Sequence, residues 1–480
     1  MNYEINGKFF NIIRNIYTND KASVKLNGKS STTFNVNVGV RQGCILSPLL
    51  FNIFLSDLAR SLQGNESVTI GSLNSIFWAD DLVMFADSED GLQNMLNLLE
   101  KYSNENYLTV NTKKTKCMIF NKNGRLLLRP FYLNNTRLEC VRLYKYLGFM
   151  ITPSGEINTG LKDLRDRAFR AFMKIRRDLG PSFNQNVPLI LSLIDSLVKP
   201  ILLYASDFWG CFKLPKSNQI DTFYMSMMKQ VLGVQKQTVN DGVLLELGRT
   251  PLSFDAKKLS IKNWERIIRG KANKPLLLSL QESVDLELPW TSHIKTNMES
   301  IGLLHFYTAN RSSKNPFVFK KVFQRLCDIF HQEIFASFTG DRSKLRTYAT
   351  FKKDPGYESY LSNIKNTKIR VNVSKFRLSN HKLMIEAGRY KKLNANERFC
   401  PFCPNVVEDE IHFLFDCPSY HPQRARLIEP IVNQLLNAHS LTVEQRFEYV
   451  MSNMDKNLCN YISNSMDLRE FLLSNPKQQG

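Results

Sequence analysis

The chain has 480 residues, with 64 Lys and Arg against 44 Asp and Glu, which gives a formal net charge of +20. Hydrophobic residues make up 43% of the sequence, which is typical of globular proteins and argues against a largely disordered chain. A strongly basic balance favours a polyanionic partner. No apolar run approaches the roughly 18 residues of a membrane-spanning helix.

The sequence has nine cysteines, which is an odd number, and its amino terminus shows no signal-peptide pattern. This argues against a disulfide framework. We therefore expect an intracellular protein of the nucleus or the cytoplasm, or both, with no membrane partner.

The amino-terminal part alternates helical and strand patterns. Residues 9–17 are helix-like, and residues 24–26 and 34–38 favour strands around an Asn27-Gly28 turn. Ser47 is then a candidate N-cap and Pro48 a candidate first helical residue. The apolar face that follows has helical spacing, and its members are Leu50, Phe51, Phe54, Leu55 and Leu58.

The loop before that helix carries Arg41, Gln42 and Gly43. Glycine lets a backbone approach a ligand closely. Arginine and glutamine bond to phosphates, sugars and base edges. This loop is therefore a candidate nucleotide-binding segment.

Two adjacent carboxylates, Asp80 and Asp81, stand between the apolar segments 75–78 and 82–85. Both segments favour strands, so a hairpin with the aspartates at its turn is predicted. Burying two negative charges together is costly unless a cation neutralises them. Such a pair suits Mg²⁺ and two-metal phosphoryl transfer. The alternative is an ordinary turn, since Asp is a good turn former.

Further along, Ser88 is predicted to start a helix. Pro153-Ser154-Gly155 interrupts the pattern, and from Leu161 the chain becomes helical and basic. This face either contacts phosphates or is a solvated surface. A second, apolar helix is predicted over residues 187–204, whereas residues 250–370 give no chemical signal.

Near the carboxyl terminus, Cys400, Cys403, His412 and Cys417 form the pattern C-x2-C-x8-H-x4-C. Three thiolates and one imidazole suit a closed tetrahedral Zn²⁺ site. His421 is an alternative ligand. The zinc knuckle formed by these residues either takes part in nucleic-acid binding or only stabilises a small core.

Basic and aromatic residues interleave just before this cluster, in residues 375–382 and 389–392. Such a pattern suits contact with a nucleic-acid backbone together with base stacking. We expect this stretch and the zinc knuckle to act together.

Four blocks together resemble the reverse transcriptases of non-LTR (LINE-type) retrotransposons. They are Gly39 to Leu50 with its Gln-Gly and Ser-Pro pairs, Trp78-Ala79-Asp80-Asp81, the Asn111 to Thr115 block, and Tyr144 to Gly148. The Cys-Cys-His-Cys arrangement also ends many LINE-type polyproteins. Trp78 stands where this family usually has Tyr or Phe.

The resemblance implies an RNA-directed DNA polymerase with Mg²⁺ and a structural Zn²⁺. It implies that Asp80 and Asp81 hold Mg²⁺ and that Lys114 lies near the pyrophosphate. It also implies that Arg41, Gln42, Gly43 and Trp78 contact nucleotide or template. Tyr146, Leu147 and Gly148 would position the primer.

The expected fold is α+β: a partial fingers and palm over residues 1–152 and a helical thumb over 153–250. An α-rich connector (251–370), the basic segment with the zinc knuckle (371–425) and a helical tail (426–480) would follow. The implied partners are an RNA template, a DNA primer or target, and the rest of the element's polyprotein.

The family carries a further metal-binding Asp on a strand before the Gln-Gly block, and we expect the chain to begin too late to contain it. We therefore expect the carboxyl-terminal part of a larger polyprotein, a truncated copy or an incomplete gene model. A catalytically inactive nucleic-acid-binding remnant is the main alternative, and a splicing maturase of related fold is a weaker one.

Overall fold

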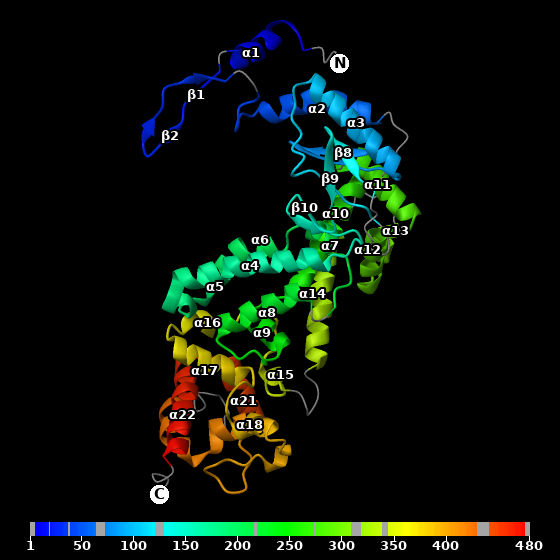
Figure 1. Cartoon of the computed structure of the whole chain (residues 1–480). Coiled ribbons are helices and arrows are strands. Elements are labelled where there is room, and N and C mark those ends of the chain that lie inside the picture. The colour runs from blue at the N-terminus through cyan, green and yellow to red at the C-terminus, as the bar shows by residue number, and fades with distance from the viewer. Residues whose placement is uncertain are drawn as a thin grey trace. The chain divides into compact units, whose positions relative to one another are not determined.

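The computed structural model divides the chain into two compact units (Figure 1). The first unit comprises residues 1–144, 152–155 and 272–286, and the second comprises residues 145–151, 156–271 and 287–480. The structure describes residues 5–18, 20–36, 39–63, 73–120, 129–215, 218–271, 274–308, 318–337, 344–429 and 441–475.

The first unit combines short strands with a few helices, as an α+β class predicts. Its elements are α1 (Gly7–Thr18), β1 (Lys21–Ala22), β2 (Lys25–Leu26), β3 (Lys29–Ser30), β4 (Phe34–Asn35), α2 (Ser47–Gln63), β5 (Ser75–Trp78), β6 (Asp81–Met84), α3 (Glu89–Glu105), β7 (Lys116–Cys117), β8 (Phe131–Leu133), β9 (Thr136–Cys140) and α11 (Lys274–Asp285). Strand β9 pairs in parallel with β7 and antiparallel with β8.

Helices α2 and α3 are present as predicted, but Phe54, which the spacing placed on the apolar face of α2, is 40% exposed. The Ser88 hydroxyl caps α3 by accepting a hydrogen bond from the Gly91 amide at 3.0 Å. The apolar faces of both helices pack against the strand β8. The buried side chains of this core are Leu55, Leu58, Leu62, Met95, Leu96, Leu99, Cys117, Phe131, Leu133 and Leu138.

Ser47 does not cap α2 as predicted. It is the first helical residue, and its hydroxyl donates to the Arg41 carbonyl at 2.6 Å. The side chain therefore ties the preceding loop to the helix instead of satisfying a helix amide.

The predicted pairing of residues 24–26 with 34–38 is wrong. The Asn27-Gly28 turn is present, but it joins β2 to β3, while β4 pairs with β1. Positive φ at both Asn27 and Gly28 suits a two-residue hairpin turn, which joins β2 directly to β3. Strand β4 pairs instead with β1, which precedes this hairpin.

The second unit is almost entirely helical. It contains the hairpin β10 (Tyr144–Tyr146) and β11 (Phe149–Ile151), and the helices α4 (Asn158–Leu179), α5 (Val187–Leu193), α6 (Lys199–Leu202), α7 (Ser206–Trp209), α8 (Gln219–Leu232), α9 (Asn240–Glu246), α10 (Leu252–Arg266), α12 (Pro289–Ser300), α13 (Leu304–Thr308), α14 (Val318–Ser337), α15 (Tyr348–Phe351), α16 (Tyr360–Asn363), α17 (Thr367–Arg377), α18 (Met384–Tyr390), α19 (His421–Leu427), α21 (Val443–Ser452) and α22 (Lys456–Ser474).

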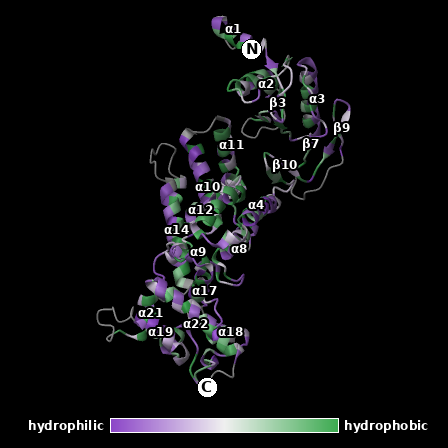
Figure 2. Ribbon diagram, turned by 90° about the vertical axis from the view of Figure 1, so that its left-hand side faces the viewer, coloured by the Kyte–Doolittle hydropathy of each residue, from purple (hydrophilic) through white to green (hydrophobic). Residues whose placement is uncertain are grey.

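These helices are amphipathic, and hydrophilic and hydrophobic residues alternate along them in Figure 2. Their apolar faces form one continuous core that extends from Leu161 to Ile462. The apolar helix predicted over residues 187–204 is confirmed in outline, with a π-helical turn over Ile194–Val198 between α5 and α6. The division of this unit at residues 250, 370 and 425 stays a prediction.

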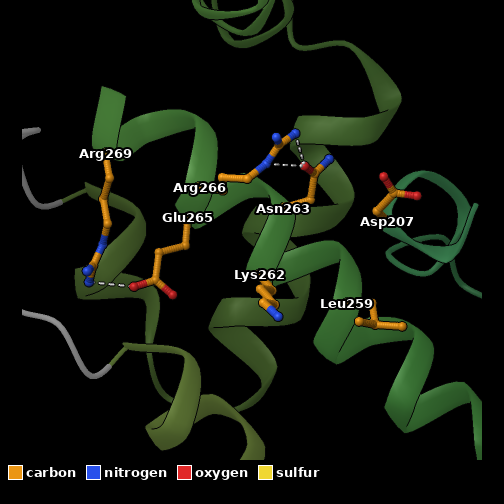
Figure 3. A pocket seen from close by; sticks show the side chains of 7 residues that line it. All are labelled: Asp207, Leu259, Lys262, Asn263, Glu265, Arg266 and Arg269. Atoms are coloured by element: carbon orange, nitrogen blue, oxygen red, sulfur yellow. Dashed lines mark hydrogen bonds and ion pairs between the residues drawn. The ribbon is translucent and has the colours of Figure 1, made fainter. Parts of the chain in front are cut away.

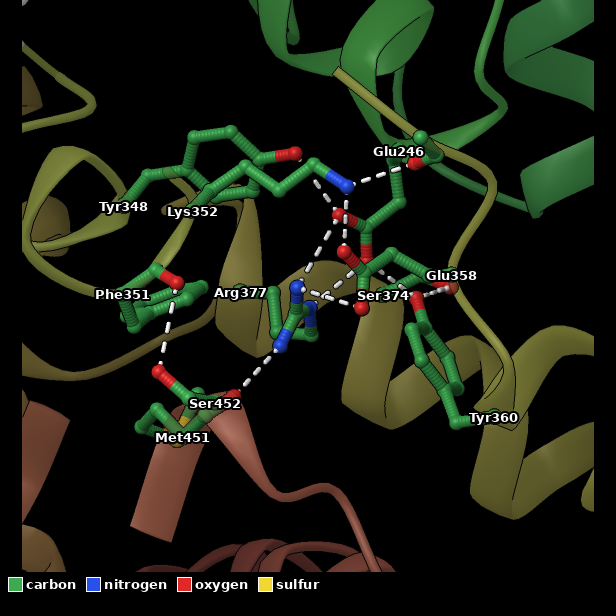
Figure 4. A network of polar contacts seen from close by, with 11 residues as sticks. Glu246, Tyr348, Phe351, Lys352, Glu358, Tyr360, Ser374, Arg377, Met451 and Ser452 are labelled. Carbon is green, nitrogen blue, oxygen red and sulfur yellow. Dashed lines mark hydrogen bonds and ion pairs between the residues drawn. The ribbon is translucent and has the colours of Figure 1, made fainter. Parts of the chain in front are cut away.

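Arg377, in α17, lies at the centre of this core (Figure 4). Its guanidinium pairs with Glu246 at 2.7 Å and Glu358 at 3.0 Å, and donates to the Met451 carbonyl at 2.9 Å. The Phe351 ring lies 4.6 Å from the charge. One buried cation thus joins segments from α9, the residues before α16, and α21.

Two tyrosines complete the buried network. Tyr348 and Tyr360 donate to the Glu246 carboxylate at 2.8 and 2.6 Å. Burial, reinforced by the charge of Glu246, raises the pKa of both phenols well above the usual value. Burial opposes the charge on Arg377, but Glu246 and Glu358 outweigh it, so its pKa is raised.

No helix within the described ranges is both long and apolar enough to cross a membrane.

Candidate active site and metal centre

The predicted hairpin around the two aspartates is present. Strands β5 and β6 are antiparallel, with Trp78 opposite Asp81, so Ala79 and Asp80 alone form the turn. Ala79 has φ +52°, a region that residues other than glycine seldom adopt. A two-residue turn requires such a conformation, so the turn holds Asp80 at the tip and Asp81 at the first strand position.

Asp80 and Asp81 are both exposed, and the Trp78 ring beside them is 65% exposed. Their oxygens are therefore accessible to a ligand from solvent. Carboxylate oxygens are the donors that Mg²⁺ takes from proteins, so the pair fits such an ion chemically.

The loop before α2 is held by Arg41 rather than open at that residue. Its guanidinium donates to Asp20 at 2.8 Å and to the Ile16 carbonyl at 2.8 Å. Gln42 and Gly43, the next two residues, are exposed. The structure thus leaves Gln42 and Gly43 accessible and shows Arg41 ordering the loop.

Lys114 lies in a turn before β7. The Asn111 side chain accepts the Lys114 amide at 3.1 Å, and the Thr115 hydroxyl donates to the Asn111 carbonyl at 3.0 Å. The Asn and Thr of the block therefore shape this turn, and the Lys114 ammonium extends into solvent.

The Tyr146-Leu147-Gly148 segment is the turn of the β10–β11 hairpin in the second unit. Leu147 has φ +44° and Gly148 has φ +84°. Positive φ at both central residues is the signature of a type I′ turn, which fits a two-residue hairpin loop.

The predicted metal ligands Cys400, Cys403, His412 and Cys417 are brought together and are all buried. Their donor atoms lie within 4.8 Å of one another, and the Cys403 and Cys417 sulfurs are 3.8 Å apart. The alternative ligand His421 is not in this group. Three thiols and an imidazole are a soft donor set that can hold a zinc ion.

A π-helical turn over His412–Asp416 explains how donors five residues apart converge. In an α-helix, positions i and i+5 are about 140° apart around the axis. The Cys417 amide instead bonds the His412 carbonyl at 2.9 Å, and this i to i+5 closure brings both side chains to one side. The His412 Nε2 atom is buried without a hydrogen-bond partner, as a metal ligand would be.

Ion pairs outside the predicted ligand set support this cluster. Arg469 pairs with Glu408 through two hydrogen bonds of 2.7 Å. Arg346 pairs with Glu410 at 2.6 Å, and His381 lies 3.1 Å from the same carboxylate. No local sequence pattern identifies these ion pairs, because the two partners of each pair are far apart in the chain.

The prediction for the basic and aromatic stretch needs correction. Phe376, Arg377 and His381 are buried, so they serve the core and do not face a nucleic acid. Tyr390, Lys391 and Lys392 are exposed, as predicted for a contact surface. The charge of these residues in the sequence did not distinguish the buried ones from the exposed ones.

A shallow hollow beside α10 has a mixed lining (Figure 3). Arg266 bonds Asn263 at 2.9 Å, and Arg269 pairs with Glu265. The lining residues are Asp207, Leu259, Lys262, Asn263, Glu265, Arg266 and Arg269. None of them belongs to the predicted sites, and acidic side chains balance much of its positive charge.

Comparison with known proteins finds similarity in the amino-terminal third of the chain. Residues 2–151 match the family described as reverse transcriptase (RNA-dependent DNA polymerase). This part of the chain is similar to the reverse transcriptase region of non-LTR retrotransposon proteins. The match spans the Gln-Gly loop, the Asp80-Asp81 hairpin, Lys114 and the β10–β11 hairpin.

Several curated proteins similar to this part of the chain come from insect retrotransposons. The Pol polyprotein of the R2DM element of Drosophila melanogaster is 31% identical over 165 residues, which are 31% of this chain and 15% of the relative. The corresponding R2 polyprotein of Nasonia vitripennis is 30% identical over 158 residues, 31% of the chain and 15% of the relative.

A third relative is the RNA-directed DNA polymerase of the mobile element jockey from Drosophila funebris. It is 22% identical over 232 residues, 47% of this chain and 25% of the relative. The matched region thus spans only 15% to 25% of these three proteins.

Proposed function

We propose that this chain is part of an RNA-directed DNA polymerase of a LINE-type retrotransposon. In the reaction, a primer 3′-hydroxyl attacks the α-phosphate of a deoxynucleotide and releases pyrophosphate. The observation that carries the proposal is the exposed Asp80-Asp81 pair at a strained two-residue turn, within the matched residues 2–151. Strained backbone often accompanies functional sites.

In this proposal Asp80 is the principal Mg²⁺ ligand and Asp81 is a second ligand or its support. Divalent cations bound there neutralise charge on the attacking and leaving oxygens. Trp78, opposite Asp81, provides an exposed ring beside the primer end or the incoming nucleotide.

Gln42 and Gly43 contact the nucleotide and template, since both are exposed in the loop that Arg41 holds through Asp20. Arg41 can contact the nucleotide or template only if its ion pair with Asp20 breaks. Lys114, exposed on its turn, neutralises or protonates the pyrophosphate. Tyr146, Leu147 and Gly148 contact the primer end.

The finer assignments of palm and thumb are also proposals. The first unit supplies the palm, and α4 supplies the thumb helix, with exposed Arg170, Lys174 and Arg177 available to duplex phosphates. The Cys/His cluster holds Zn²⁺, and the exposed Tyr390, Lys391 and Lys392 contact nucleic acid.

The proposed partners are an RNA template, a DNA primer or target, and the rest of a polyprotein. These substrates are found inside cells, so we propose that the protein acts in the nucleus or the cytoplasm.

Primer extension on an RNA template with a DNA primer and Mg²⁺ tests the proposal. Asp80→Asn should abolish incorporation while RNA binding persists, because phosphate contacts elsewhere supply the affinity. Asp57→Asn is a matched control, since Asp57 is an exposed aspartate on α2 outside the proposed site. Incorporation that survives in Asp80→Asn contradicts the proposed role.

The second candidate function is nucleic-acid binding without catalysis. The net charge of +20 favours it independently of the aspartate hairpin. Salt-sensitive RNA binding by a wild-type chain that incorporates no nucleotide would support this alternative.

A further inference from the structure

The β10–β11 hairpin is held by two side chains from neighbouring helical segments. The Tyr204 hydroxyl, just after α6, donates to the Leu147 carbonyl. Nη2 of Arg167, on α4, donates to the Gly148 carbonyl at 2.8 Å. Both carbonyls of the central turn residues are thus bonded from outside the hairpin.

The two donors are themselves fixed. Arg167 pairs with Asp163 at 3.0 Å, and its guanidinium lies 5.8 Å from the centre of the Tyr204 ring. The Tyr204 carbonyl accepts the indole N–H of Trp209 at 2.8 Å. Trp209 is fully buried, so the tyrosine is anchored to the helical core.

Close packing leaves the turn little freedom to move. A Cβ added at Gly148 would lie 3.3 Å from the Tyr204 hydroxyl, which is tighter than ordinary contact. A Cβ added at Gly160 on α4 would overlap the Phe149 ring, and Phe149 packs edge-on against Phe208. The hairpin therefore sits directly on α4 without intervening side-chain bulk.

We infer that Tyr204 and Arg167 are positioning residues that hold the Leu147-Gly148 turn where it contacts the primer 3′ end. This inference rests on the proposed primer role of the turn. Neither side chain needs to touch the primer, because each acts through a backbone carbonyl. The turn residues, left in positive φ by this clamp, direct Leu147 outward, where it is partly exposed.

The test uses the full chain bound to an RNA–DNA template–primer whose primer ends in a photoreactive nucleotide. Cross-linking to the peptide of residues 145–151 is measured beside template–primer affinity. Tyr204→Phe removes only the hydroxyl and should lower the cross-link yield roughly five-fold, the effect of one lost hydrogen bond. Affinity should stay unchanged, because phosphate contacts set it.

Arg167→Gln should act in the same direction, and Arg167→Lys should restore part of the yield. Tyr107→Phe and Arg426→Gln are controls, since both residues are exposed and lie outside the proposed contacts. Amide hydrogen exchange at residues 147–149 should rise in Tyr204→Phe and not in Tyr107→Phe.

A wild-type chain that extends primers but does not cross-link at 145–151 overturns the inference and leaves the proposed function intact. Unchanged yield and exchange in Tyr204→Phe overturn it as well. Conversely, clamp-dependent cross-linking by a chain that incorporates no nucleotide supports the inference and contradicts the proposed polymerase activity.

Discussion

Arg377 and Glu246 lie 131 positions apart in the sequence and form a fully buried ion pair, with 2.7 Å between Arg377 Nε and Glu246 Oε1. The pair is surrounded by hydrogen bonds from Tyr348 and Tyr360, which satisfy the remaining carboxylate lone pairs. Good pairing offsets the cost of taking both charges out of water, but only while every partner is present.

Removing Arg377 should therefore destabilise the second unit strongly. We expect Arg377→Met to lower the free energy of unfolding by about 3–5 kcal/mol, because Glu246 is left buried without its cation. Urea unfolding followed by circular dichroism measures this. Lys382→Gln is the control: its pair with Glu470 is exposed, so a change below about 0.5 kcal/mol is expected. Equal effects of the two substitutions would contradict the central role of Arg377.

Alkaline pH should weaken the same network. The pKa values of Tyr348 and Tyr360 are raised in the folded state, so their contribution is fully present below the unfolded pKa of about 10. Above that pH the unfolded chain releases protons that the folded chain retains. Stability should then fall by about 1.4 kcal/mol per pH unit for each tyrosine.

The measurement is the unfolding free energy between pH 9 and 11. Tyr360→Phe should remove one tyrosine's share of the slope, whereas Tyr107→Phe, at a side chain 96% exposed, should leave the slope unchanged. A slope that Tyr360→Phe does not alter would argue against the buried phenol as its source.

The Cys/His cluster predicts bound zinc. Cys417→Ser should lose the metal and lower the melting temperature, because structural zinc contributes directly to folding. Elemental analysis of the purified chain measures the metal, and a zinc chelator should reproduce the loss of stability. Cys459→Ser is the matched control: Cys459 is buried and free but lies outside the cluster. Zinc retained by Cys417→Ser would exclude Cys417 as a ligand.

The turn of the aspartate hairpin predicts a stabilising substitution. Ala79→Gly should raise the free energy of unfolding by roughly 0.5–1 kcal/mol, since glycine adopts positive φ without the strain that alanine bears. Ala59→Gly, within α2, should instead destabilise by about 0.5–1 kcal/mol. Chemical denaturation of both variants decides this, and a loss of stability in Ala79→Gly would contradict the strained turn.

Short sequence patterns correctly predicted the elements whose structure depends on residues close together in the chain. The Ser88 cap, the α2 face and the Asp80-Asp81 hairpin all follow from patterns within a few residues. The spacing of the three cysteines and the histidine also predicted that these four side chains come together.

Residues whose role depends on distant partners could not be identified in this way. Arg377 and His381 lie in a run that reads as basic surface, and only Glu246 and Glu410, far away in sequence, reveal them as core. Tyr204 and Arg167 carry no motif either, since each is defined by a backbone carbonyl that it meets in space. The exposure of Asp80 depends on which other segments cover the turn. The alternation of apolar and polar residues within the two strands does not determine this.

Each of the two proposed functional hairpins turns within two residues, one at Ala79-Asp80 and the other at Leu147-Gly148. Side chains alternate between the two faces of a strand, so one added residue would send every following side chain to the opposite face. These two segments should thus accept a change of side chain more readily than a change of length. A single in-frame codon gained at either turn of this chain would therefore be more damaging than most substitutions nearby.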